Sequence, residues 1–262
     1  METALFTTFQ GNCIELLSTL PKRHSLHCFR SALRHLELAK NLLAVDPAMA
    51  IFRGVTAEEE AASGLMHCLR ELHYAEADRL NPRNHVHKHA LFPFMRIVGL
   101  FFGQIFENKL KEYHLHIKEE EGHRRLMLAF PISIGGESQW AYPLPPLNFG
   151  VKVGTPETPP SYKSQISAFV SAKGAKNIRT YLKKEANLRN EVLYAGPTGY
   201  PEIQELKPEF LLEKASHVLS LLQAYLMIAP YSERQPYVQD ALGAFLAMVG
   251  ALEQSEITPA GS

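Results

Sequence analysis

The sequence lacks several features that would indicate a class of protein directly. Its 27 basic and 27 acidic side chains cancel, so the formal net charge is zero and no overall basic surface indicates nucleic-acid binding. No stretch of about 18 apolar residues is without charge, so we expect no membrane span. No basic stretch near the N-terminus leads into a long apolar run, so we expect no signal peptide.

Cysteine is also scarce, and the sequence has no glycine-rich phosphate-binding loop and no nucleophile elbow. The three cysteines, Cys13, Cys28 and Cys68, are odd in number, far apart and flanked by apolar residues. This pattern is typical of reduced thiols in a core and argues against a disulfide framework or a zinc site. We therefore expect a cytoplasmic protein that needs no cofactor.

Helical periodicity is what the sequence does contain. Apolar residues recur at intervals of three and four between His24 and Val45, which predicts an amphipathic helix. Further helices are expected at residues 11–20, 163–172, 176–194, 208–228 and 236–252. Because the chain has 262 residues, these helices can bury a sizeable core.

Two longer helices are predicted between these segments. Residues 56–59 (TAEE) fit a capping box, so a helix is expected to begin there and to run to Leu80. Asn81-Pro82 would end this helix. The next helix is expected from Arg83 to Glu112, with a kink at Pro93.

The periodicity changes after residue 112. Apolar and polar residues alternate from Tyr113 to Lys118, as in a strand, and a second strand is expected at residues 126–132. Weaker strands are expected at residues 139–142 and 149–153. The fold class we expect is therefore mainly α, a helical bundle with a small β-hairpin or sheet insertion in the middle.

Four parts of the chain follow from these changes in pattern. They are an N-terminal helical part (1–112), the β insertion with a proline-rich loop (113–160), C-terminal helices that complete the bundle (161–254) and a polar tail (255–262). We see no internal repeat and no low-complexity tract in the sequence.

The densest group of chemically active side chains lies in residues 81–89 (NPRNHVHKH). Histidine has the unperturbed pKa that suits proton transfer near neutral pH, and arginine can donate two parallel hydrogen bonds to a phosphate. On a helix, His85 and His89 share a face, and Arg83 lies on the turn before them. The N–H groups and partial positive charge of the helix N-terminus also favour a phosphate. This stretch is therefore a candidate site for metal-independent RNA cleavage.

Three parts of the sequence resemble the HEPN superfamily. Residues 36–44, 48–52 and 56–62 look like its opening helix pair, in which the second helix begins with consecutive glutamates. Arg83, followed by the polar Asn84 and separated from His89 by five residues, is similar to the HEPN signature. Residues 188–195 look like the later part of the AbiV-type abortive-infection proteins, which are the nearest resemblance.

The resemblance implies a ribonuclease of phage defence that acts as a homodimer. Two such motifs would share one cleft, and the RNA product would carry a 2′,3′-cyclic phosphate. Arg83 would then hold the scissile phosphate, and His89 would be the acid or base. Asn84 would orient one of these groups, and Glu59 would face the same cleft. The candidate catalytic residues are Arg83, His89, Asn84 and Glu59, and the candidate substrate-binding residues are His85 and Lys88.

Three other interpretations stay open. The charged residues after Asn81-Pro82 also fit a solvated helix start without chemistry. A HEPN-like chain can also be a non-catalytic interaction or dimerisation module, with residues 113–160 as the surface for a protein partner. His85 and His89 could instead bind zinc from one helix face, which would make the chain a metal-binding helical protein.

Overall fold

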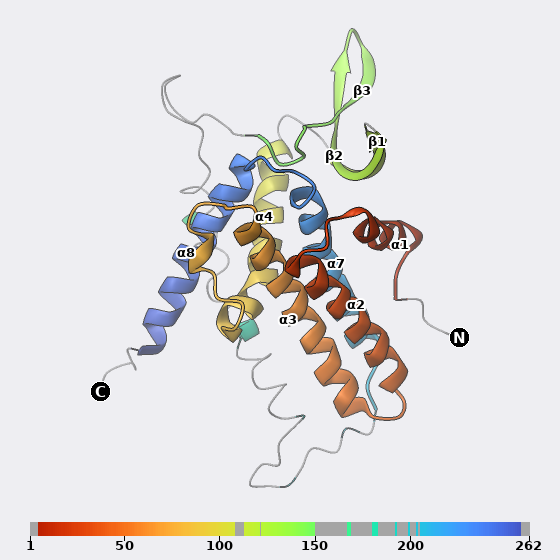
Figure 1. Cartoon of the computed structure of the whole chain (residues 1–262), viewed down its shortest axis with the longest axis vertical. Helices are drawn as coiled ribbons and strands as arrows, with labels where there is room; N and C mark the ends of the chain where they lie inside the picture. The colour runs from red at the N-terminus through yellow and green to blue at the C-terminus, as the bar shows by residue number, and fades with distance from the viewer. Residues whose placement is uncertain are drawn as a thin grey trace.

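The computed structural model of the protein describes residues 5–107, 113–120, 122–149 and 205–257, together with residues 167–168, 180–182, 192, 199 and 203. Figure 1 shows a bundle of helices with a small sheet that projects from one end. The expected class, mainly α with a small sheet in the middle of the chain, is confirmed. The helices predicted at 163–172 and 176–194 and the strand at 149–153 lie almost entirely outside the described residues.

The first two helices follow the apolar pattern of the sequence. α1 (Thr8–Glu15) continues through a 3-10 turn, η1 (Leu16–Thr19), and α2 (His24–Leu42) follows. Both predicted helices are confirmed. α2 buries one face, with Leu26 and Phe29 in the core, as the three-and-four spacing requires.

α3 (Pro47–Glu71) is one continuous helix, so the predicted start of a helix at Thr56 is wrong. Asp46 caps its N-terminus, where the carboxylate accepts a hydrogen bond of 2.9 Å from a backbone N–H of the first turn. Thr56 lies inside the helix, and its hydroxyl donates to the carbonyl oxygen of Phe52 at 2.8 Å. Because Glu59 is therefore in the middle of a helix, its carboxylate can contact neighbouring helices instead of capping α3.

α3 also ends earlier than predicted, at Glu71. His73 and Glu76 have φ angles of 57° and 63°, which end the helical path, and a 3-10 turn, η2 (Ala77–Arg79), follows. The guanidinium of Arg70 donates to a carbonyl oxygen of η2 at 3.1 Å. This contact holds the connection against the end of α3.

α4 (His85–Glu107) begins two residues later than predicted because Asn84 caps it. The side-chain oxygen of Asn84 accepts a hydrogen bond of 2.8 Å from the backbone N–H of Val86. Pro93 lies inside α4, as predicted. Residues 108–112, which were expected to extend this helix, lie outside the described residues.

The insertion forms a three-stranded antiparallel sheet in the order β1-β2-β3, with β1 (His114–Glu120), β2 (His123–Ile134) and β3 (Glu137–Ala141). The strands predicted at 113–118, 126–132 and 139–142 are confirmed. Gly135-Gly136 joins β2 to β3 with φ angles of 62° and 88°, which glycine adopts without steric cost. Alternate residues in the middle of β2 (Leu126, Leu128 and Phe130) belong to the main apolar core, so this part of β2 anchors the sheet to the helices.

α3 lies at the centre of the bundle and packs against α2, α4 and α7 (Pro208–Ile228) (Figure 1). α8 (Pro236–Ile257) packs against α4. Both C-terminal helices begin where the sequence predicts. None of the described helices combines the length with the apolar composition that a membrane span requires. Because α3 is central, its side chains can contact residues of three different helices.

Candidate functional site

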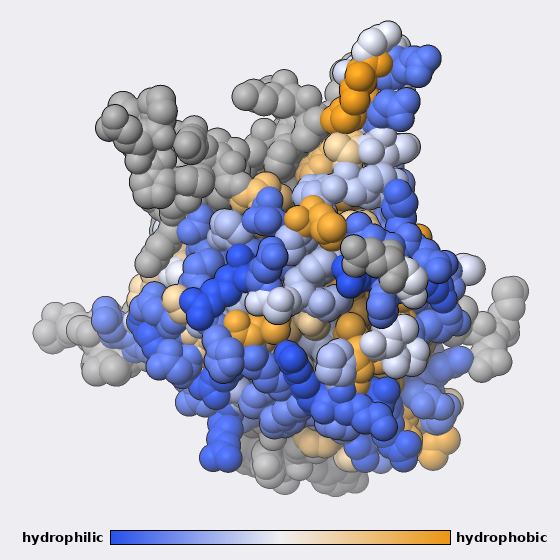
Figure 2. Space-filling view, turned by 45° about the horizontal axis from the view of Figure 1, so that its top comes forward, coloured by the Kyte–Doolittle hydropathy of each residue, from blue (hydrophilic) through white to orange (hydrophobic). Residues whose placement is uncertain are grey.

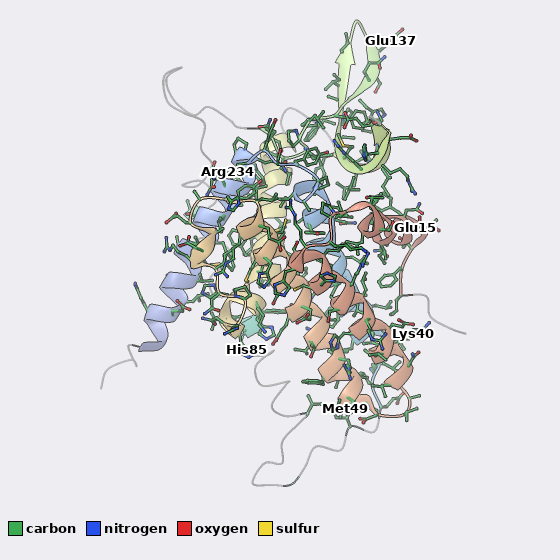
Figure 3. The ribbon with its side chains drawn as sticks, in the orientation of Figure 1. Glu15, Lys40, Met49, His85, Glu137 and Arg234 are labelled. Atoms are coloured by element: carbon green, nitrogen blue, oxygen red, sulfur yellow. The ribbon has the colours of Figure 1, made fainter. Side chains whose placement is uncertain are left out.

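The candidate site lies where the first turn of α4 meets the middle of α3. In Figure 3, His85 marks this place near the lower end of the bundle, and Glu137 marks the tip of the sheet at the upper end. The site and the sheet are therefore at opposite ends of the molecule. A substitution in the candidate site therefore leaves the sheet unchanged, and a substitution in the sheet leaves the candidate site unchanged.

Glu59 of α3 gathers three side chains from the first turns of α4. Its Oε1 atom lies 3.0 Å from His85 Nδ1 and 2.9 Å from His89 Nε2. Its Oε2 atom lies 2.5 Å from Lys88 Nζ. These three residues come together because positions three and four apart share one face of a helix. We call Glu59, His85, Lys88 and His89 the Glu59 group.

The carboxylate of Glu59 is ionised in this setting. Burial acts to raise its pKa, but the hydrogen bonds and charges of His89 and Lys88 outweigh burial and hold the pKa well below its usual value. An ionised carboxylate only accepts hydrogen bonds. The histidine atoms that face it, Nδ1 of His85 and Nε2 of His89, are therefore the protonated nitrogens of their rings.

The two histidines of the group differ in their access to solvent. The side chain of His85 is 54% exposed, whereas that of His89 is 6% exposed. Nδ1 of His89 is buried and has no hydrogen-bond partner among the described residues. His85 is thus the histidine that a large substrate can reach, although the sequence motif points to His89.

Arg83 and Asn84 lie outside the Glu59 group. Arg83 is exposed on the turn before α4, and its backbone N–H donates to Asn81 Oδ1 at 3.0 Å. Asn84 caps α4, and its Nδ2 atom donates to Glu253 Oε1 of α8 at 2.8 Å. Asn84 therefore fixes the start of α4 and ties it to α8, a structural role that the motif did not indicate. Arg83 remains at the surface, near the helix N-terminus, where an anion would bind.

A second charged cluster lies on the other side of α3, and the sequence analysis missed it. Glu58 Oε2 lies 2.9 Å from Lys214 Nζ and 2.9 Å from His217 Nδ1, both on α7. The hydroxyl of Tyr181 donates to Glu58 Oε1, and the ring of His217 stacks on Phe92 at a centroid distance of 3.5 Å. The available signal was the three-residue spacing of Lys214 and His217 on one helix face. We call Glu58, Lys214, His217 and Tyr181 the Glu58 group.

The Glu59 group also has the composition of a metal site. The ligand atoms of Glu59, His85 and His89 all lie within 4.8 Å of one another, and two histidines with a carboxylate are a known zinc-binding set. Lys88 argues against an ion here, because its ammonium lies 2.5 Å from the same carboxylate and would repel a second cation. The hydrogen bonds described above account for this arrangement without a metal.

Comparison of the chain with family models, curated proteins and solved structures finds no match. The resemblance to the HEPN superfamily therefore stays a prediction. It depends on the residues of the chain and on the geometry that surrounds them.

Proposed function

We propose that the chain is a HEPN-like, metal-independent ribonuclease of phage defence in which His85 performs the proton transfer. The observation that carries this proposal is the contact of 3.0 Å between Glu59 Oε1 and Nδ1 of the exposed His85. A carboxylate at Nδ1 fixes the tautomer and orientation of an imidazole, so the other ring nitrogen can accept a proton. The carboxylate also stabilises the imidazolium that results.

The reaction then follows from these groups. His85 Nε2 takes the proton of an RNA 2′-hydroxyl, and the 2′-oxygen attacks the adjacent phosphorus. The bond from phosphorus to the 5′-oxygen breaks, which leaves a 2′,3′-cyclic phosphate and a 5′-hydroxyl that gains a proton. Arg83 and the N-terminus of α4 would stabilise the charge on the phosphate.

A homodimer would complete such a site. One chain places a single exposed histidine in the Glu59 group, whereas the reaction needs a base and an acid. The second copy would supply the acid that protonates the 5′-oxygen. In this proposal Lys88 and His89 hold Glu59 in place and do not contact the RNA.

The experiment is expression of the wild-type chain and of His85→Ala and Arg83→Ala variants in cells, with growth and total RNA followed. His27→Ala is the matched control, because His27 is an exposed helical histidine far from the site in sequence. We expect RNA fragmentation in the wild type and the control and intact RNA in the two site variants. Fragmentation by a folded His85→Ala variant at the wild-type level would contradict the proposal.

A second candidate function is a protein-interaction module, and the sheet carries the observation that favours it. Four of the seven large apolar side chains exposed among the described residues lie in or beside the insertion: Tyr113, Ile134, Trp140 and Leu144. Figure 2 shows apolar side chains along the projecting hairpin. Exposed apolar surface of this kind is typical of a binding face.

The same cell assay separates the two functions. A phenotype that survives His85→Ala and Arg83→Ala but is lost in Ile134→Ser or Trp140→Ser would favour the interaction module. Val45→Ser is the matched control, since Val45 is the most exposed of these apolar residues and lies between α2 and α3, away from the insertion.

A further inference from the structure

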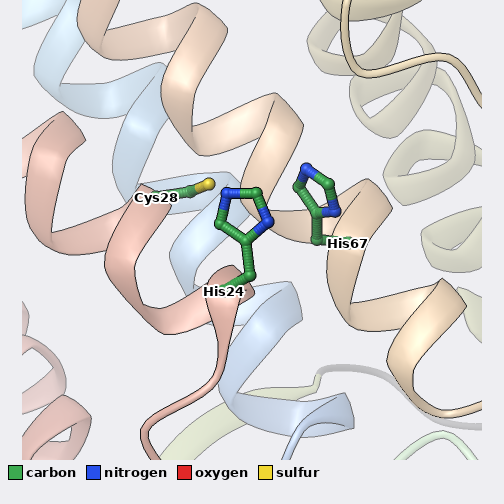
Figure 4. Close-up of side chains that lie close together, drawn as sticks. All are labelled: His24, Cys28 and His67. Carbon is green, nitrogen blue, oxygen red and sulfur yellow. The ribbon is translucent and has the colours of Figure 1, made fainter.

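Three metal-ligating side chains meet between α2 and α3, at a place where the sequence gives no sign of a site. His24 and Cys28 are four residues apart on α2 and share one face of it, and His67 faces them from α3 (Figure 4). One ligand atom from each residue lies within 4.8 Å of those of the other two. The two imidazole rings are 4.0 Å apart between centroids.

The three residues form a small site that is open on one side. Cys28 is buried, with 6% of its surface exposed, His67 is half-buried, and His24 is exposed. An ion could therefore enter past His24 and reach the thiol at the base. The backbone beneath is fixed, because α2 and α3 pack along each other.

The spacing is close to what a tetrahedral ion requires. Bonds of about 2.0–2.1 Å to nitrogen and about 2.3 Å to sulfur put tetrahedral ligands roughly 3.5 Å apart. The present separations of up to 4.8 Å need to close by about one ångström. Rotamer changes of the exposed His24 and of the half-buried His67 would bring their ring nitrogens towards Cys28 Sγ by that amount.

The surroundings of Cys28 do not favour a reactive cysteine. Burial, with a smaller contribution from Glu60 and Glu71, raises the pKa of the Cys28 thiol to about 11. Such a thiol is a poor nucleophile. Glu71 is held by Ser25, whose hydroxyl donates to its carboxylate at 2.5 Å, so it is not counted among the ligands.

The geometry points to a zinc site formed by His24, Cys28 and His67, with the fourth coordination position open to solvent. Two imidazoles and one thiolate are a set that zinc accepts when one position is left for water or another ligand. This site is separate from the Glu59 group. His67 follows Glu59 by eight residues on α3, about 12 Å along the helix axis.

The test is metal binding by the purified full-length chain. Protein is loaded with Zn²⁺, freed of excess ion, and its metal content measured. A parallel sample with Co²⁺ reports a thiolate ligand through its sulfur-to-cobalt absorption band. The variants are His24→Ala, Cys28→Ser and His67→Ala, and the matched controls are His27→Ala, Cys13→Ser and His85→Ala.

We expect one equivalent of zinc and the thiolate band in the wild type and in all three controls. The Cys28→Ser variant should lose the band, and each of the three variants should lose the tightly held zinc. His24 is exposed, so His24→Ala should keep the fold even if Cys28→Ser does not, and circular dichroism of the metal-free proteins checks this.

Two results at this site would overturn the assignment, and a third would move the ion to another site. One is a wild-type chain that retains no zinc. The other is zinc retained equally by His24→Ala and His67→Ala. Loss of zinc in His85→Ala alone would place the ion in the Glu59 group, so this outcome overturns the inferred site and also contradicts the metal-independent mechanism proposed above.

Discussion

Glu58 and Glu59 are neighbours in the sequence, yet their carboxylates bind lysines on different helices. Glu58 Oε2 lies 2.9 Å from Lys214 Nζ on α7, and Glu59 Oε2 lies 2.5 Å from Lys88 Nζ on α4. The side chains of consecutive residues on a helix point about 100° apart, so adjacent residues of a central helix can contact two different neighbouring helices. α3 thus carries one carboxylate that is sealed in the interior and one at the edge of the surface.

The interior carboxylate should matter for stability. Glu58 and Lys214 are each 1% exposed, so removing one of them takes the opposite charge away from the other in the interior. We expect Glu58→Leu or Lys214→Met alone to lower the free energy of unfolding by about 3–5 kcal/mol. The double variant should lose far less than the sum of the two, because it removes both charges. Urea denaturation of the four proteins measures this coupling.

An exposed pair gives the control for that experiment. Arg79 and Glu76 also form an ion pair, at 2.5 Å, but both side chains are about half exposed. Removing the charge with Arg79→Ala should change the free energy of unfolding by less than about 1 kcal/mol. Equal losses in Arg79→Ala and Lys214→Met would contradict the role assigned to burial.

Stability should fall in acid as Glu58 takes up a proton. Burial acts to raise the pKa of Glu58, but the hydrogen bond from His217 and the charge of Lys214 lower it from 4.5 to about 2. A pKa that is lower in the folded state gives stability that is fully present above the unfolded value. This contribution is therefore lost as the pH falls from about 4.5 towards 2.

The measurement is the free energy of unfolding at a series of pH values in that interval. Glu58→Gln should show a smaller decline than the wild type. If Glu58→Gln alone does not fold, Glu58→Gln combined with Lys214→Met serves the same purpose. Identical pH dependence in the wild type and the variant would show that Glu58 does not titrate as its surroundings require.

Two helical glycines should respond in opposite ways to alanine. A Cβ atom at Gly64 would lie 2.9 Å from ring atoms of Phe29 and 3.1 Å from the carbonyl oxygen of Ser25, both on α2. We expect Gly64→Ala to destabilise the protein by about 1–3 kcal/mol. Gly99 on α4 has nothing within 4 Å of such an atom, so Gly99→Ala should stabilise it by about 0.5–1 kcal/mol. Thermal or urea unfolding distinguishes the two; stabilisation by Gly64→Ala would contradict the close approach of α2 and α3.

The parts of the fold that follow apolar periodicity could be predicted from the sequence. α2 and α7 each bury residues at intervals of three and four, and this pattern is visible without a structure. The capping box at residues 56–59 misled because it is a local pattern, whereas α3 continues through it with Val55 and Ala57 buried. Burial of these two residues, which flank Thr56, outweighs the preference of threonine for the first position of a helix.

The site could be predicted only in part. The density of histidines after Asn81 marked the start of α4, and the resemblance singled out Glu59. The exposure of His85 and the burial of His89 could not be seen, since they depend on how α4 packs against α3 and α8. The contact between Glu58 and Lys214 could not be predicted, because the two residues are 156 positions apart in the sequence.

The most direct test of the account is cleavage of a labelled RNA by the purified protein in the presence of a chelator. We expect the wild type and His27→Ala to cleave it and to leave 2′,3′-cyclic phosphate ends. His85→Ala should lower the rate constant by about 10²–10⁴-fold, the usual contribution of a general base. Cleavage that persists unchanged in a folded His85→Ala variant, or that stops in the wild type when the chelator is added, would contradict the proposed site.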